Sequence, residues 1–209
     1  MDNFVKTKQA IKIVGMAGII SLMATMPAAA HVGDHSTSTF AHGLLHPFNG
    51  LDHVLAMIAV GLYAVQLGGR ALWLVPAAFV GTMIVGALLG YLGAPMPMAE
   101  AGIALSVVAM GVAIAVGLRL PLIAATMLVG AFALFHGHAH GNEGLAIGMS
   151  FLPYAAGFIV ATSLLHLSGI ALGAGLNKLG STPSFVLNKL AGTAGAIAGV
   201  SLLTGWLAA

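Results

Sequence analysis

The chain has 209 residues, of which 59% are hydrophobic and only 6% are charged, and its net charge is +2. Soluble domains carry about 25% charged residues, so this composition excludes a globular surface that faces water. The small net charge disfavours a nucleic-acid partner, and the absence of cysteine excludes disulfides, iron–sulfur clusters and thiolate metal sites. The sequence predicts an all-α, polytopic membrane helix bundle.

Residues 1–30 have the features of a secretory signal peptide. Three lysines precede a short apolar run, which ends at the small-residue cleavage site Pro27-Ala-Ala-Ala. We expect cleavage after Ala30, which makes His31 the first residue of a mature transmembrane domain, 31–209, outside the cytoplasm. The free amine and ring nitrogen of His31 would then chelate a metal ion, with His35 and His42 in the same capture arm. The alternatives are an uncleaved first transmembrane helix and a tail whose histidines are incidental.

The first cluster of ionisable residues reads His46-Pro-Phe-Asn-Gly-Leu-Asp52-His53. Pro47 and Gly50 disfavour a continuous helix here, so we expect His46 to lie on a turn above Asp52 and His53. On an unbroken helix His46 and His53 would be about 10 Å apart along the axis, too far to share one ion, and a break closes that gap. Asp52 also stands inside an apolar run, where carboxylates are costly and usually functional.

Six apolar stretches of membrane-spanning length follow the signal peptide. They are Leu51–Leu67, 71–92, 98–118, 121–136, 145–169 and 185–207. Pro76 and Pro153 fall inside spans and are expected to kink them. Glycine pairs spaced by four residues indicate close packing between helices. These pairs are Gly86/Gly90, Gly137/Gly141, Gly144/Gly148, Gly169/Gly173 and Gly195/Gly199.

The charged residues predict how this bundle is oriented in the membrane. With the mature N-terminus outside, the basic residues all fall on the cytoplasmic side, as the positive-inside rule requires. They are Arg70, Arg119, Lys178 and Lys189, whereas the outer segments carry Asp34, Glu100 and Glu143. We therefore expect a multi-pass protein of a bacterial inner membrane with its histidine clusters on the outer side.

The second cluster, Phe135-His136-Gly-His138-Ala-His140-Gly-Asn-Glu143, ends the fourth predicted span. If it is helical, His136, His140 and Glu143 share one face, whereas His138 points the other way. Imidazole and carboxylate without sulfur favour Ni²⁺, Co²⁺, Zn²⁺ or Mn²⁺ as the bound ion. His166, alone in the fifth span, is either a packing residue or a later point on a metal path.

Both clusters resemble signatures of one family. The segment from His46 to His53 resembles the H-P-x-x-G-x-D-H signature of the HupE/UreJ proteins, which are bacterial nickel permeases associated with hydrogenase and urease operons. The segment from Phe135 to Glu143 resembles their second signature, F-H-G-x-A-H-G-x-E. Glu100 lies where the family also tends to carry an acidic residue, and His138 occupies a variable position. The resemblance implies metal-path roles for His46, Asp52, His53, His136, His140 and Glu143.

The sequence and the resemblance together predict a secondary permease, not an enzyme, that imports nickel for a nickel-enzyme maturation system. No nucleotide-binding motif is present, and we expect no permanently bound cofactor. A cobalt permease and a metal-binding membrane accessory that does not transport are the main alternatives. A b-type haem carrier is disfavoured, because the histidines crowd one membrane edge beside carboxylates. Proton coupling and homo-oligomer formation stay open.

Overall fold

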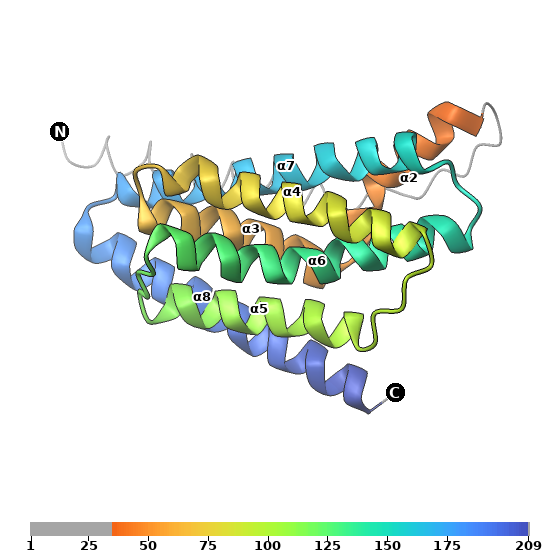
Figure 1. Ribbon diagram of the computed structural model, residues 1–209. Helices are drawn as coiled ribbons and strands as arrows, with labels where there is room; N and C mark the ends of the chain where they lie inside the picture. Colours follow the sequence, from red (N-terminus) through yellow and green to blue (C-terminus); the bar gives the residue numbers. More distant parts are fainter. Residues whose placement is uncertain (1–34, 209) are drawn as a thin grey trace. The chain divides into compact units, whose positions relative to one another are not determined.

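The computed structural model describes residues 35–208, and all regular secondary structure in that part of the chain is helical (Figure 1). The predicted signal peptide and His31 lie outside the described residues. The helices are α2 (His35–Asn49), α3 (Leu51–Leu67), α4 (Ala71–Tyr91), α5 (Ala99–Ala115), α6 (Leu122–Ala146), α7 (Phe151–Asn177) and α8 (Ser181–Leu207). The prediction of an all-α fold is confirmed for this region.

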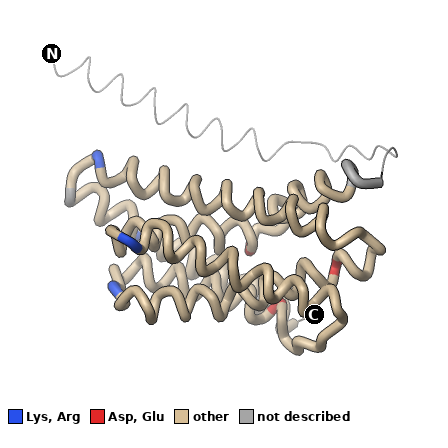
Figure 2. Tube along the Cα trace, turned by 45° about the horizontal axis from the view of Figure 1, so that its top comes forward, with Lys and Arg blue, Asp and Glu red and all other residues tan. Residues whose placement is uncertain are grey.

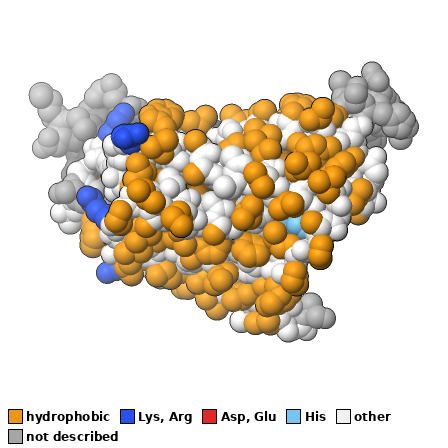
Figure 3. Space-filling model, in the orientation of Figure 1, with side chains coloured by type: hydrophobic (Ala, Val, Ile, Leu, Met, Phe, Trp, Pro, Cys, Tyr) orange, Lys and Arg blue, Asp and Glu red, His pale blue; other side chains and the backbone are white. Residues whose placement is uncertain are grey.

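Four of the helices, α4, α6, α7 and α8, are long and apolar enough to cross a membrane. A fifth crossing is formed if α2 and α3, which meet at an angle of 83°, count as one broken span. Helix α5 is apolar but has only 17 residues. Large apolar side chains such as Trp73, Ile123 and Leu152 are exposed on the outside of the bundle, and Figure 3 shows hydrophobic side chains over most of the visible face. Such a surface suits lipid.

Glycines hold the helices close together. On α4, Gly86 faces the Leu134 carbonyl and Gly90 faces the His138 carbonyl, while Gly137 and Gly141 of α6 face carbonyls of α4 in return. No side chain fits between these backbones, which is how small residues let membrane helices pack. The predicted role of these two glycine pairs is confirmed. Gly148 differs from the prediction, because it lies in a turn with φ of 68°.

This packing predicts opposite effects for two substitutions on the same helix. A Cβ at Gly86 would collide with the Leu134 carbonyl and lie 3.1 Å from the His138 nitrogen, whereas a Cβ at Gly81 has nothing within 4 Å. We expect Gly86→Ala to lower the free energy of unfolding by about 1–3 kcal/mol. Gly81→Ala should raise it by about 0.5–1 kcal/mol. Thermal unfolding in detergent measures both, and equal effects would contradict the close α4–α6 contact.

Three elements depart most from the predicted spans. Helix α2 was not predicted, and His46 lies within it and not on a turn. Helix α6 continues ten residues past His136 to Ala146, because Gly137 and Gly141 gain a packing partner in α4 that offsets their poor helix propensity. Helix α7 begins at Phe151, after the turn at Gly148, and not at residue 145. Pro153 therefore stands in the first turn, where it removes no helical hydrogen bond and causes no kink.

Opposite charges gather at opposite ends of the bundle. Lys and Arg residues lie toward one end of the chain trace, and Asp and Glu residues lie toward the other (Figure 2). The connections between α3 and α4 and between α5 and α6 carry Arg70 and Arg119 at the basic end. The break before α3 and the start of α5 bring Asp52 and Glu100 to the acidic end. This separation agrees with the predicted placement of the loops.

Candidate metal site

The break between α2 and α3 places Asp52 and His53 at the acidic end of the bundle. Gly50 caps α3, and a Cβ there would lie 2.6 Å from Asp52 Oδ1 and 2.8 Å from His53 Nδ1, so only glycine leaves room for both side chains. The predicted break is therefore confirmed, at Gly50. It brings the rings of His46 and His53 to a centroid separation of 6.4 Å, closer than a straight helix allows.

Asp52 orients His53. Its Oδ1 atom accepts hydrogen bonds from the backbone nitrogen of His53 and from His53 Nδ1, both at 2.8 Å. A carboxylate only accepts, so Nδ1 carries the proton and Nε2 keeps a free lone pair. That Nε2 is buried and has no hydrogen-bond partner among the described residues. Metal-ligating histidines are usually fixed in this way by a carboxylate on the other ring nitrogen.

The second motif is helical, and its histidines are buried on α6. His136 Nδ1 donates a hydrogen bond to the Phe132 carbonyl at 3.0 Å, which leaves its Nε2 buried without a partner. His140 stacks on Phe158 at 5.1 Å, and neither of its ring nitrogens has a partner in the described part of the chain. Buried polar atoms are normally hydrogen-bonded, so several unpartnered nitrogens in one place indicate a ligand.

Four histidines form a continuous series, which we call the imidazole chain: His46, His140, His53 and His136. Successive ring centroids are 4.9 Å, 4.6 Å and 5.2 Å apart. Two imidazoles on one ion have centroids about 4.5 Å apart at a right angle and about 5.2 Å apart at a tetrahedral angle, given metal–nitrogen bonds near 2.1 Å. Each neighbouring pair therefore has a spacing that suits a shared ion.

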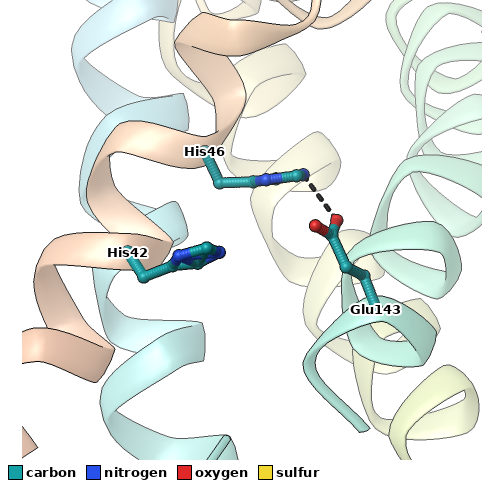
Figure 4. A group of neighbouring side chains, drawn as sticks. All are labelled: His42, His46 and Glu143. Carbon is teal, nitrogen blue, oxygen red and sulfur yellow. Dashed lines mark ion pairs between the residues drawn. The ribbon is translucent and has the colours of Figure 1, made fainter. Parts of the chain in front are cut away.

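A second group, the outer triad, consists of His42, His46 and Glu143. One ligand atom of each lies within 4.8 Å of the others, and His46 Nε2 is 2.7 Å from Glu143 Oε2. Figure 4 shows His46 and Glu143 pointing toward each other, with His42 one turn before His46 on the same helix. His42 was a weaker candidate from the sequence. Its spacing of four residues from His46 becomes informative only once α2 is known to be a helix.

Both groups border one cavity of about 620 Å³ at the acidic end. No Lys or Arg is among the described residues that line it, so its field attracts cations. Glu100, from the first turn of α5, joins the carboxylates of the two motifs here. The ionisable lining residues are His46, Asp52, His53, Glu100, His138, His140 and Glu143.

Two buried histidines of the described part of the chain, His138 and His166, belong to neither the imidazole chain nor the outer triad. His138 Nε2 bonds the Ala94 carbonyl in the α4–α5 loop. His166 is buried with both ring nitrogens unpartnered among the described residues. Phe79 separates His166 from the chain, since its ring lies 5.4 Å from His136 and 4.9 Å from His166. The sequence did not indicate a role for Phe79, because an aromatic residue in an apolar span is normally a packing residue.

Comparison with known proteins identifies the family. The family model described as HupE / UreJ protein matches residues 19–202, a range that contains both motifs and Glu100. The chain belongs to the HupE/UreJ family. It is 48% identical to Protein HupE of Rhizobium leguminosarum bv. viciae over 179 residues, which cover 85% of this chain and 91% of that protein. No solved structure matches the chain. The HupE/UreJ resemblance of the two motifs is therefore confirmed.

Proposed function

We propose that this HupE/UreJ protein is a secondary permease that imports a divalent transition metal, nickel in the first place, across a bacterial inner membrane. One observation carries the proposal: an acidic cavity leads directly into buried imidazoles whose ring nitrogens have no partner in the described structure. Oxygen ligands would capture the hydrated cation, and nitrogen ligands would receive it.

The ligand chemistry supports a transition metal that binds imidazole, and nickel is one of these. Imidazole nitrogens suit nickel, copper, zinc and iron, whereas magnesium, calcium and manganese prefer sites built from carboxylate, carbonyl and water. A soft Cu⁺ ion would prefer sulfur, and the chain has no cysteine. The nickel transport associated with the family that the motifs resemble favours nickel over cobalt.

The proposed path runs from the outer triad along the imidazole chain. The ion would exchange water for Glu143 and His46, then pass to His140, His53 and His136 in steps of one ring each. Beyond His136 it would pass the Phe79 ring to reach His166. Pairwise sites that hold an ion weakly allow it to leave again, as conduction requires. An interior-negative potential would contribute about 4.6 kcal/mol per 100 mV to the entry of a divalent ion.

The proposed topology has six crossings. The broken pair α2–α3 and the short helix α5 would each span, since about 17 residues suffice for a hydrocarbon core. The basic end, with Arg70, Arg119, Lys178 and Lys189, would face the cytoplasm, and the cavity would open outside. Cleavage after Ala30 would leave His31 at the outer mouth.

Labelled nickel uptake into cells that lack other high-affinity nickel importers tests the proposal. Expression of this chain should produce saturable uptake, and unlabelled cobalt should compete more weakly than unlabelled nickel. Uptake equal to that of empty cells, at verified expression in the membrane, would overturn the permease role. Stronger competition by cobalt would reassign the metal.

The alternative from another class is an accessory protein that holds the metal for a nickel-enzyme maturation system without transporting it. The outer triad favours it, because a site near the surface binds ions without any path behind it. Purified protein in liposomes separates the two roles: binding without flux would support the accessory role, and flux would support the permease.

The proposal predicts that uptake falls in acid. Only neutral imidazole binds a metal, so protonation competes with the ion. Protonation removes the lone pair that binds the ion, so uptake should fall as the external pH drops from about 7.5 to about 5.5. Initial rates at fixed membrane potential, clamped with a potassium ionophore, measure this effect without a change in driving force. A flat profile would contradict histidine ligation at the outer mouth.

A further inference from the structure

His138 is the one histidine of the second motif that does not join the imidazole chain. Its Nε2 lies 2.6 Å from the Ala94 carbonyl, in the loop between α4 and α5. A carbonyl only accepts, so Nε2 carries the proton and donates it. The side chain is 6% exposed, so this hydrogen bond is shielded from water. The bond joins α6 to a loop that lies 44 residues away in sequence.

The loop that His138 holds forms a wall of the cavity. Met96 and Met98 of this loop line the cavity, and so do Ala99 and Glu100 at the start of α5. Met98 has φ of 60°, in the left-handed region that residues other than glycine avoid. The loop therefore adopts a conformation that its own backbone does not favour. The hydrogen bond from His138 to Ala94 is a tertiary contact that holds this loop, which leads into α5 and Glu100.

We propose that His138 is a positioning residue for the cavity: by anchoring the α4–α5 loop to α6, it holds Glu100 in the cavity that Asp52 and Glu143 also line. This inference rests on the proposed function and adds a role for a position at which the family motif prescribes no residue. His138 touches the loop and not the ion. Within the described part of the chain, it makes no ring contact and no ion pair with the imidazole chain or the outer triad.

A direct ligand role is the competing explanation. His138 Nδ1 is buried without a partner among the described residues, as a ligand atom would be before the ion arrives. The two roles make different demands on the side chain. Anchoring needs only a donor at the Nε2 position, whereas ligation needs the imidazole lone pair on Nδ1.

Two substitutions separate these roles in the nickel uptake assay. His138→Gln keeps an amide N–H near the position of Nε2, and His138→Leu removes the donor at similar bulk. We expect His138→Leu to raise the nickel concentration for half-maximal uptake about tenfold, at the low end of the effects seen when a group that orients a metal ligand is lost. His138→Gln should stay within about twofold of the wild type, because the N–H that bonds the Ala94 carbonyl is kept. In a Glu100→Gln background, His138→Leu should add little, because residues that act through one another are not additive.

A second measurement does not depend on transport. The chain has no cysteine, so Pro97→Cys introduces a single attachment point for a spin label at an exposed loop position. In this background we expect His138→Leu to increase label mobility in the purified protein and His138→Gln to leave it unchanged. Leu118→Cys, exposed near the basic end, is the control label and should not respond.

The outcomes are distinct. Unchanged mobility at position 97 in His138→Leu would overturn the anchoring role, whatever the uptake data show. Equal loss of uptake in His138→Gln and His138→Leu, additive with Glu100→Gln, would identify a ligand and also overturn it. If the wild type carries no nickel, the proposed permease function fails, and the mobility data still decide whether His138 anchors the loop.

Discussion

Asp52→Asn is expected to lower nickel uptake at least tenfold without unfolding the protein. The asparagine side chain has the same shape and still accepts a hydrogen bond, but it removes the negative charge from the cavity. In the wild type, His53 Nδ1 lies 2.8 Å from Asp52 Oδ1, and this contact keeps the proton on Nδ1. The substitution weakens that contact. Loss of a carboxylate behind a ligating histidine typically costs 10–100-fold in metal affinity. Initial uptake rates at low nickel concentration, normalised to membrane protein level, measure the effect.

Asn142→Ala is the matched control for this substitution. Asn142 lines the same cavity and is exposed, but it takes no part in the imidazole chain or the outer triad. Its removal should leave uptake within about twofold of the wild type, as for most surface substitutions. Wild-type uptake in Asp52→Asn would show that neither the charge nor the orientation of His53 limits entry. A similar loss in both variants would indicate a general sensitivity of the cavity and not a role of Asp52.

Sequence patterns predicted the spans best where the bounds of a helix depend on local composition alone. The bounds of α3 agree residue for residue, and α4 ends within one residue of the prediction. An apolar run between charged or glycine-rich turns is enough to define such a helix. The same patterns failed where tertiary contacts decide. Helix α6 extends through two glycines because α4 packs on them, and no local property of residues 137–146 indicates that partner.

Helix α2 shows why part of the site was beyond the sequence. Pro47 and Gly50 both signal a break, and the sequence does not say which of them ends the helix. The structure ends α2 at Asn49 with Pro47 inside it, while Gly43 packs against the Tyr154 backbone of α7. That long-range contact supports a helix that polar residues alone would not predict. With α2 in place, His42 and His46 share a face, and His42 becomes part of the outer triad.

The motifs indicated the candidate residues, but not how these residues are arranged. Both signatures single out histidines and carboxylates, because these residues are rare in an apolar chain, and the structure brings several of them to one cavity. The second signature does separate His138 from His136 and His140, because His138 occupies its variable position and points the other way on a helix. What His138 contacts instead follows only from the hydrogen bond to Ala94, a residue 44 positions earlier. Phe79 is a similar case, since its importance comes only from its place between two histidine rings.

The site has features that oppose stability. Four of the five buried histidines, His53, His136, His140 and His166, have Nε2 atoms without a partner among the described residues. An unsatisfied buried polar group costs about 1–3 kcal/mol, so this arrangement is unfavourable in a protein that only needs to fold. Such local departures from good packing are expected at functional sites. Substitutions that remove these unpartnered nitrogens should leave the protein at least as stable and should impair transport.

His140→Phe is the sharpest test of that separation. Phenylalanine keeps the ring that stacks on Phe158 at 5.1 Å, and it replaces two buried nitrogens that have no partner in the described structure. Phenylalanine is only slightly larger than histidine, and His140 lies beside the cavity. Replacing an unsatisfied polar group by an apolar one of similar shape is neutral or stabilising, so the melting temperature should stay the same or rise. Uptake should nevertheless fall at least tenfold, because His140 links His46 to His53 and its loss interrupts the imidazole chain.

Thermal unfolding in detergent and labelled nickel uptake measure the two effects on the same variant. A lower melting temperature with reduced uptake would make His140 a packing residue, and full uptake would exclude the imidazole chain as the path of the ion.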